Sequence, residues 1–263
     1  MAEDSGRKYA RGVEEIVDDL RHEFIDELQE DLKILQIKLE EVRNERRDIK
    51  EVAADIQKMA ILMRGQAENL GLHLISIVAH RMEDYLADVK EFPPRIRDDL
   101  VKFADVLSDL VENRIPPDTE ARKLVRDLPP KVGFNVGDIA VRDVEIMLVM
   151  LHGIATRFVE RELQQCGYRT TTVTSPFAAI PLVVSTRPDL VMVSAVMPDL
   201  SGVDLAIGLA SMPETRNIPV TLITSLDPED DYLKLLPQHV PVILKGPSFG
   251  DDLADALDRL FLL

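Results

Sequence analysis

Short apolar runs that alternate with amphipathic segments constrain the fold of this chain more than any other feature. They fill the second half, from Val144 to Leu263, where the runs fit β-strands and the segments between them fit helices. The expected strands are 146–149, 169–173, 190–193, 220–223 and 242–244, and the expected helices are 154–165, 175–185, 203–212, 231–236 and 251–262. Such an order is typical of right-handed parallel crossovers. It predicts an α/β domain with a doubly wound parallel sheet over residues 144–263.

The first half shows helical periodicity alone. From Val13 to Val42 apolar residues recur every three or four positions, which predicts a long amphipathic helix. Further helices are expected at 48–69, from 73 to about 89, at 96–111, and in a short segment that Asp118 caps and Pro129 ends. Helices with short connections predict an all-α antiparallel bundle over residues 1–128. Residues 129–143, which contain several Pro and Gly, are the expected linker.

The expected first helix is unusually long for a globular protein. Its 30 or so residues would span about 45 Å at the usual rise of about 1.5 Å per residue. Either it projects beyond its bundle or its extra length pairs with a second copy of the chain. A homodimer through the N-terminal helix is therefore one expected assembly.

Charge and composition exclude several kinds of partner. The formal net charge is -16 at pH 7, whereas affinity for nucleic acid comes largely from Lys and Arg that neutralise phosphates, so no nucleic-acid partner is expected. No apolar run approaches the roughly 20 residues that cross a bilayer, and the first residues lack a signal-peptide pattern. We therefore expect a cytoplasmic protein without a membrane partner. Cys166 is the only cysteine, and we expect it to be a small buried hydrophobe.

One stretch of the second half resembles the receiver domains of two-component signalling. Residues 188–202 read P-D-L-V-M-V-S-A-V-M-P-D-L-S-G, a strand followed by a Pro/Asp/Gly turn. The likeness extends along the whole half through Gly167-Tyr168, Ile218-Pro-Val220 and Lys245. It implies a flavodoxin-like (βα)5 fold, a phospho-accepting aspartate after the third strand, and an acidic pair after the first strand that holds Mg²⁺.

The residues that would carry the receiver chemistry are absent from this sequence. The acceptor position holds Ser194, and the acidic pair falls on Met150 and Leu151. A thioether and a hydrocarbon cannot hold Mg²⁺, and a serine hydroxyl without an adjacent base is a poor nucleophile. Thr224 and Lys245 retain the two switch positions, and Lys245 is expected to make a structural contact with Ser194 and Thr224. No cofactor or metal is expected.

The helical half resembles histidine phosphotransfer domains. Residues 60–72 read A-I-L-M-R-G-Q-A-E-N-L-G-L, and residues 77–83 read I-V-A-H-R-M-E. The phospho-accepting histidine of that family is replaced by Ile61. At about 100° per residue Ile61 lies off the apolar stripe of its helix, so an exposed Ile61 with Lys58, Arg64 and Gly65 would form an apolar docking spot. The alternative, that the first helix covers Ile61, stays open.

His80 is the remaining candidate for a phospho-acceptor in the helical half. It shares a face with His73, Ser76 and Asp84, opposite the apolar stripe, so His80 is expected to be accessible to solvent. Phosphoryl transfer requires an exposed neutral imidazole with an in-line path. The alternative is that His80 is an ordinary surface histidine without a role in phosphoryl transfer.

Four functional hypotheses follow from these residues. The first is a non-catalytic signalling protein, not an enzyme, that binds a histidine kinase, phosphotransfer or receiver domain through retained docking surfaces. The second is an active phosphorelay protein with His80 as acceptor. The third is a dimeric, coiled-coil-like scaffold. An enzyme of small-molecule chemistry ranks last, because the sequence has no phosphate loop, nucleophile elbow or metal cluster.

Overall fold

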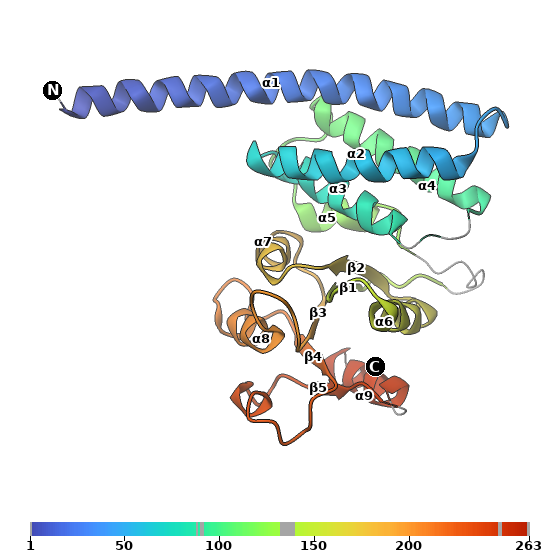
Figure 1. Cartoon of the computed structure of the whole chain (residues 1–263), viewed down its shortest axis with the longest axis vertical. Coiled ribbons are helices and arrows are strands. Elements are labelled where there is room, and N and C mark those ends of the chain that lie inside the picture. Colours follow the sequence, from blue (N-terminus) through green and yellow to red (C-terminus); the bar gives the residue numbers. More distant parts are fainter. Residues whose placement is uncertain (1, 88, 90–91, 132–139, 247–248, 262–263) are drawn as a thin grey trace. The chain divides into compact units, whose positions relative to one another are not determined.

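The computed structural model describes residues 2–87, 89, 92–131, 140–246 and 249–261. The chain divides into two compact units (Figure 1). The first comprises Met1–Thr119 with Asp127–Pro129, and the second comprises Glu120–Arg126 with Pro130–Leu263. In the described part of the chain, no helix is both long and apolar enough to span a membrane.

The first unit is all-α, as predicted, and its described residues form four helices that pack as a bundle. Its helices are α1 (Ala2–Arg43), α2 (Ile49–Asn69), α3 (His73–Leu86) and α4 (Pro94–Val111). Helix α1 packs against α2 and α4, and α3 packs against the same two helices from the other side. The apolar stripes meet in a core that includes Leu28, Leu35, Val52, Ile56, Met63, Met82, Leu100, Phe103 and Leu107. Asp48 caps α2, because its carboxylate accepts the Lys50 N–H at 2.8 Å.

The second unit contains a five-stranded parallel sheet in the order β2-β1-β3-β4-β5. The strands are β1 (Glu145–Val149), β2 (Arg169–Val173), β3 (Leu190–Ser194), β4 (Val220–Thr224) and β5 (Val242–Leu244). The helices are α5 (Ala121–Asp127), α6 (Ile154–Gln165), α7 (Pro176–Thr186), α8 (Gly202–Ser211), the 3-10 turn η1 (Leu233–Leu235) and α9 (Phe249–Phe261). This is the flavodoxin-like order expected for a doubly wound sheet.

Alternate residues of the central strands enter two separate apolar cores. Met147 and Val191 point to the side that α7 and α8 cover, and Leu148 and Met192 point to the side that α6 and α9 cover. Strands buried on both faces read as continuous apolar runs, because neither face meets water. For this reason the apolar runs in the sequence predicted the bounds of these strands closely.

Several sequence predictions need correction. Helix α3 ends at Leu86 and not near Val89, and Asp118 does not cap the short helix, which begins at Ala121. The predicted helix at 231–236 is a 3-10 turn only, since Asp230 accepts the Tyr232 N–H and holds a turn there. Cys166 is exposed and not buried. The expected linker falls largely on residues 132–139, outside the described residues.

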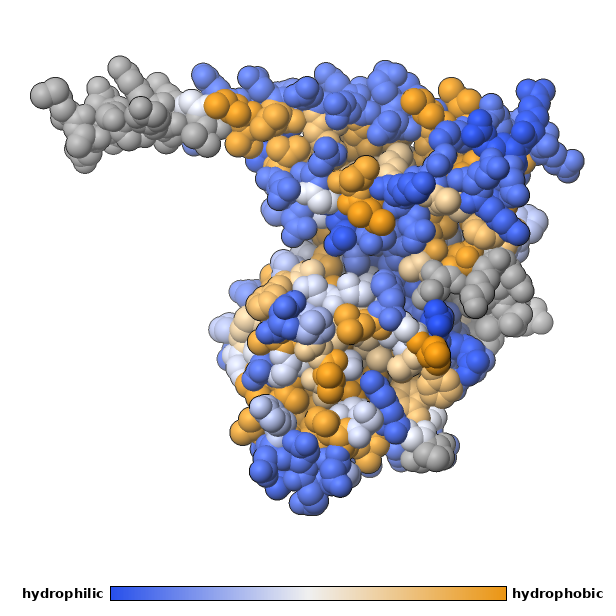
Figure 2. Space-filling view, in the orientation of Figure 1, coloured by the Kyte–Doolittle hydropathy of each residue, from blue (hydrophilic) through white to orange (hydrophobic). Residues whose placement is uncertain are grey.

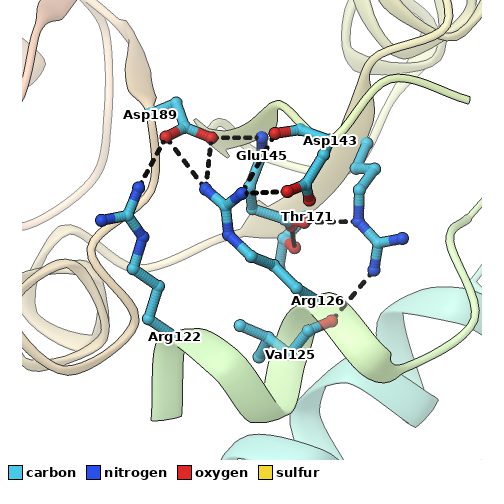
Figure 3. Close-up of polar contacts among 8 residues, drawn as sticks. Arg122, Val125, Arg126, Asp143, Glu145, Thr171 and Asp189 are labelled. Atoms are coloured by element: carbon cyan, nitrogen blue, oxygen red, sulfur yellow. Dashed lines mark hydrogen bonds and ion pairs between the residues drawn. The ribbon is translucent and has the colours of Figure 1, made fainter. Parts of the chain in front are cut away.

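Helix α5 groups with the sheet and not with the bundle, to which the predicted boundary at residue 128 assigned it. Figure 3 shows the polar contacts that hold it. Arg126 donates to both carboxylate oxygens of Asp189, at 3.0 and 2.8 Å, and Arg122 donates to one of them at 3.1 Å. The same carboxylate accepts the Glu145 N–H at 2.8 Å, at the start of β1. Asp189 thereby joins α5 to the amino ends of the strands.

Candidate functional site

The predicted receiver positions come together at the carboxyl edge of the sheet. Met150 directly follows β1, Ser194 ends β3, Thr224 ends β4, and Lys245 directly follows β5. Because β3 lies between β1 and β4, these positions are on neighbouring strands. In open α/β sheets this edge is where ligands bind.

The hydroxyl groups at this edge are occupied by local backbone contacts. Ser194 is buried, and its hydroxyl lies 3.4 Å from the Val196 carbonyl oxygen to which it donates. The Thr224 hydroxyl accepts the Leu226 N–H at 3.0 Å. Both side chains shape the loops that follow their strands, and neither has a base beside it in these contacts.

Lys245 is the cation at this edge. Its backbone N–H donates to the Thr224 carbonyl at 2.7 Å, which fixes the end of β5 against β4. Partial desolvation lowers the pKa of the Lys245 ammonium below its ordinary value. Within the described residues the ammonium makes no hydrogen bond or ion pair, so the predicted side-chain contact with Ser194 and Thr224 is not found.

The edge does not fit the magnesium ion that the receiver resemblance implies. Met150 is buried, and Leu151 is 51% exposed. Neither side chain offers an oxygen, whereas Mg²⁺ in proteins is held by carboxylate and water oxygens.

Apolar side chains occupy the surface of the same edge. Besides Leu151, Ile154 at the start of α6 is 82% exposed and Val196 after β3 is 68% exposed. Exposed apolar residues that cluster on one surface are typical of binding sites. The sequence analysis missed Ile154 and Val196, although Val196 lies in the loop after a buried strand and Ile154 starts the helix that follows another, which was a usable signal.

On the bundle, Ile61 is exposed and Gly65 leaves open space beside it. Ile61 is 44% exposed, which excludes the alternative in which α1 covers it. A side-chain carbon added to Gly65 would meet nothing within 4 Å. Lys58 is exposed, whereas Arg64 forms an ion pair with Glu83 at 2.8 Å. Of the two predicted cations beside Ile61, Arg64 is thus already partnered.

His80 is 9% exposed, so the prediction that it is accessible to solvent is wrong. The prediction assumed that α3 has one buried stripe. In the structure α3 is buried over most of its circumference, including Arg81 and Asp84. A buried imidazole has no in-line path for a phosphoryl group, which removes the support for His80 as acceptor.

Comparisons with known proteins concern the receiver resemblance. No protein-family model matches the chain. Over 91 residues it is 30% identical to the response regulator PleD of Caulobacter vibrioides, and this match covers 35% of this chain and 20% of PleD. Over 90 residues it is 31% identical to the probable transcriptional regulatory protein TcrX of Mycobacterium tuberculosis, and this match covers 34% of this chain and 38% of TcrX. The second unit is a receiver-like domain.

Solved structures similar to the receiver-like domain include receiver domains of two kinases. One is the signal receiver domain of a signal transduction histidine kinase from Syntrophus aciditrophicus, with 32% identity, 45% of this chain and 90% of that chain covered, and a TM-score of 0.41. The other belongs to a sensor histidine kinase of Pseudomonas aeruginosa, with 22% identity, 46% and 98% covered, and a TM-score of 0.41. The chain spans less than two fifths of the length of PleD or TcrX. The likeness of the bundle to phosphotransfer domains stays a prediction from the sequence.

Proposed function

We propose that this chain is a non-catalytic two-component signalling protein that binds a histidine kinase, phosphotransfer or receiver domain. The observation that carries the proposal is the carboxyl edge of the receiver-like domain. Met150, Leu151 and Ser194 stand where the chemistry requires carboxylates, and Leu151, Ile154 and Val196 are exposed at the same edge. Binding free energy at such a surface comes from apolar contacts and not from phosphate charge.

The absence of phosphoryl transfer is the first testable prediction. Incubated with acetyl phosphate and Mg²⁺, the full chain is expected to show no added phosphoryl mass by intact mass spectrometry, because no carboxylate can attack phosphorus at position 194. An active receiver in the same reaction is the positive control. A stable phospho-adduct on any residue of this chain contradicts the proposal.

The second prediction concerns the docking spot formed by Lys58, Ile61 and Gly65. A charged side chain in the middle of an apolar contact must be desolvated without a partner, so Ile61→Asp is expected to weaken binding of the kinase, phosphotransfer or receiver partner by about 30-fold. Affinity capture from the native host followed by titration of the captured domain measures this. Ile37→Asp is the matched control, because Ile37 is 61% exposed on another helix.

Each outcome of the capture bears on a different part of the proposal. If Ile61→Asp and wild type bind the domain equally, the docking spot on the bundle is wrong. Leu151→Asp then tests the carboxyl edge of the receiver-like domain in the same titration. If both variants bind the domain as tightly as wild type does, neither surface is the docking site, and the proposed function is wrong.

A further inference from the structure

An open groove lies between α1 and α2 of the bundle. Its volume is about 510 Å³, within the range of about 300–1,000 Å³ that is typical of ligand-binding clefts. Buried apolar side chains line its floor, Leu28 and Leu35 from α1 and Ile56 and Met63 from α2. The groove can therefore take several apolar side chains of a ligand.

Both walls of the groove end in uncovered apolar side chains. Ile34 on α1 is 50% exposed, and Leu62 on α2 is 68% exposed. Two helices that lie side by side leave between them a channel against which a third helix can place its apolar face. Along α1 the lining runs from Phe24 to Lys38, which is about 21 Å at about 1.5 Å per residue. A helix of about 14 residues has the same length.

A row of unpaired acidic side chains runs along α1 into the groove. Glu15, Asp19, Glu23, Glu27 and Asp31 follow one another at intervals of four residues, and all are exposed. Within the part of the chain that the structure describes, none of the five forms an ion pair. The row turns by about 40° per step and reaches the groove at Glu27 and Asp31, which line it. Like charges four residues apart on a helix repel one another, so a cationic partner would stabilise this row.

The lysines of the groove do not neutralise the acidic row. Lys38 pairs with Asp55 across the groove at 2.7 Å, and this hydrogen bond lowers the pKa of the Asp55 carboxyl. Lys58 lies one turn further along α2 than Asp55. Glu27, in contrast, is about 16 Å from Lys38 along the axis of α1. The groove therefore has an acidic end at Glu27 and an end near Lys38 where charges of both signs lie together.

We propose that this groove binds a basic amphipathic helix of another protein. The apolar face of that helix lies against Ile34 and Leu62, and its Lys or Arg side chains lie along Glu27 and Asp31, where opposite charges attract. Met59, which also lines the groove, has an unbranched side chain that adapts to the shape of a bound helix. Helix α1 of a second copy carries the same acidic row and would be repelled. Figure 2 shows the hydrophilic residues along α1 with apolar residues between them.

The groove is separate from the docking spot formed by Lys58, Ile61 and Gly65. Ile61 and Gly65 are not among the residues that line the groove, although Lys58 borders both surfaces. A helix bound in the groove is thus a second ligand, besides the signalling domain proposed above. A peptide can test the groove without any signalling domain, and its failure to bind would leave the proposed function intact.

The experiment is a titration of a fluorescently labelled peptide with the full chain, followed by fluorescence anisotropy. The probe is a synthetic helix of about 14 residues that repeats Leu-Lys-Lys-Leu-Leu-Lys-Leu, and its counterpart has Glu in place of every Lys. The salt concentration is about 150 mM, at which exposed charges more than about 8 Å apart are largely screened. The basic peptide is expected to bind with a Kd of about 10 μM, and the acidic peptide at least about 30-fold more weakly.

A pair of charge variants tests whether the acidic row contacts the peptide. Glu27→Lys is expected to weaken binding of the basic peptide about 10-fold, because attraction becomes repulsion at the groove. Asp26→Lys is the matched control, because Asp26 is the exposed neighbour of Glu27 and does not line the groove. It changes the net charge equally, yet it is expected to change the Kd less than about twofold.

A pair of apolar variants tests whether the peptide enters the groove. Leu62→Ala is expected to weaken binding about 10-fold, since an apolar contact is lost at the centre of the interface. Ile37→Ala is its control, because Ile37 is 61% exposed on α1 but does not line the groove, and it is expected to leave the Kd unchanged. Circular dichroism checks that each variant stays folded.

Three results would each overturn the proposal. The first is no binding of the basic peptide at about ten times the expected Kd. The second is equal affinity for the basic and the acidic peptide. The third is a loss of affinity in either control variant as large as in the variant with which it is paired.

Discussion

Gly202→Ala is expected to destabilise the receiver-like domain by about 3 kcal/mol or more, although it adds a single methyl group. A side-chain carbon at Gly202 would overlap the carbonyl oxygen of Ser194 and lie 2.7 Å from its carbonyl carbon. Backbone atoms at the end of β3 cannot rotate away as a side chain can. Loss of protection of the β-strand amides in hydrogen exchange at rising urea measures the effect.

Gly208→Ala is the matched control on the same helix. Gly208 lies within α8, where an added carbon meets nothing within 4 Å. Alanine in a helix interior is favoured over glycine by about 1 kcal/mol, so this variant is expected to be neutral or more stable. If both variants lower the urea midpoint equally, close approach of α8 to β3 is not the reason for glycine at 202.

The position of Gly202 was recognisable in the sequence because its function in the fold is local. A strand, a Pro/Asp turn and a glycine at a fixed spacing must bring the start of the next helix back against the strand end. The five strands were predictable for a similar reason, since runs buried on both faces leave a continuous apolar pattern. The alternation of strands and helices predicted parallel crossovers, whereas the order of the strands was implied by the receiver resemblance.

Features that depend on packing between distant segments were not predictable from periodicity. His80 lies opposite the apolar stripe of α3, yet it is buried, because α3 is covered on several sides. A helix covered in this way buries polar residues as well as apolar ones, and periodicity does not indicate this. The open groove of about 510 Å³ between α1 and α2 could likewise not be predicted from the sequence, since it depends on the separation of two helices. Helix α5 was assigned to the bundle because its residues fit any amphipathic helix, whereas Asp189, which holds it, is more than 60 residues away.

Glu145→Ala is expected to cost the receiver-like domain about 3–5 kcal/mol. The Glu145 carboxylate accepts from Arg169 Nε at 3.1 Å and from the Thr171 hydroxyl at 2.8 Å. The side chains of Glu145 and Arg169 are only 6% and 8% exposed. Removal of the carboxylate takes a charged hydrogen-bond partner from the Arg169 guanidinium in a site from which water is largely excluded, which costs far more than loss of a surface pair. The same urea and hydrogen-exchange measurement applies.

Glu162→Ala is the surface control for this pair. Glu162 lies 3.4 Å from Arg161, whose side chain is 60% exposed, so its loss is expected to cost less than about 1 kcal/mol. Equal losses for Glu145→Ala and Glu162→Ala contradict the expectation that burial makes the difference.

The double variant Glu145→Ala with Arg169→Ala separates the cost of removing one partner of a buried pair from the value of the pair. Because the double variant removes both charges of the pair, its loss is expected to be smaller than the sum of the two single losses. Arg169 also donates to the Val125 carbonyl of α5 at 2.9 Å, so every variant that lacks Arg169 is expected to lose amide protection in α5. Glu145→Ala alone keeps that donor. Protection of α5 that falls equally in all three variants would mean that the whole amino end of the sheet, and not Arg169 itself, positions this helix.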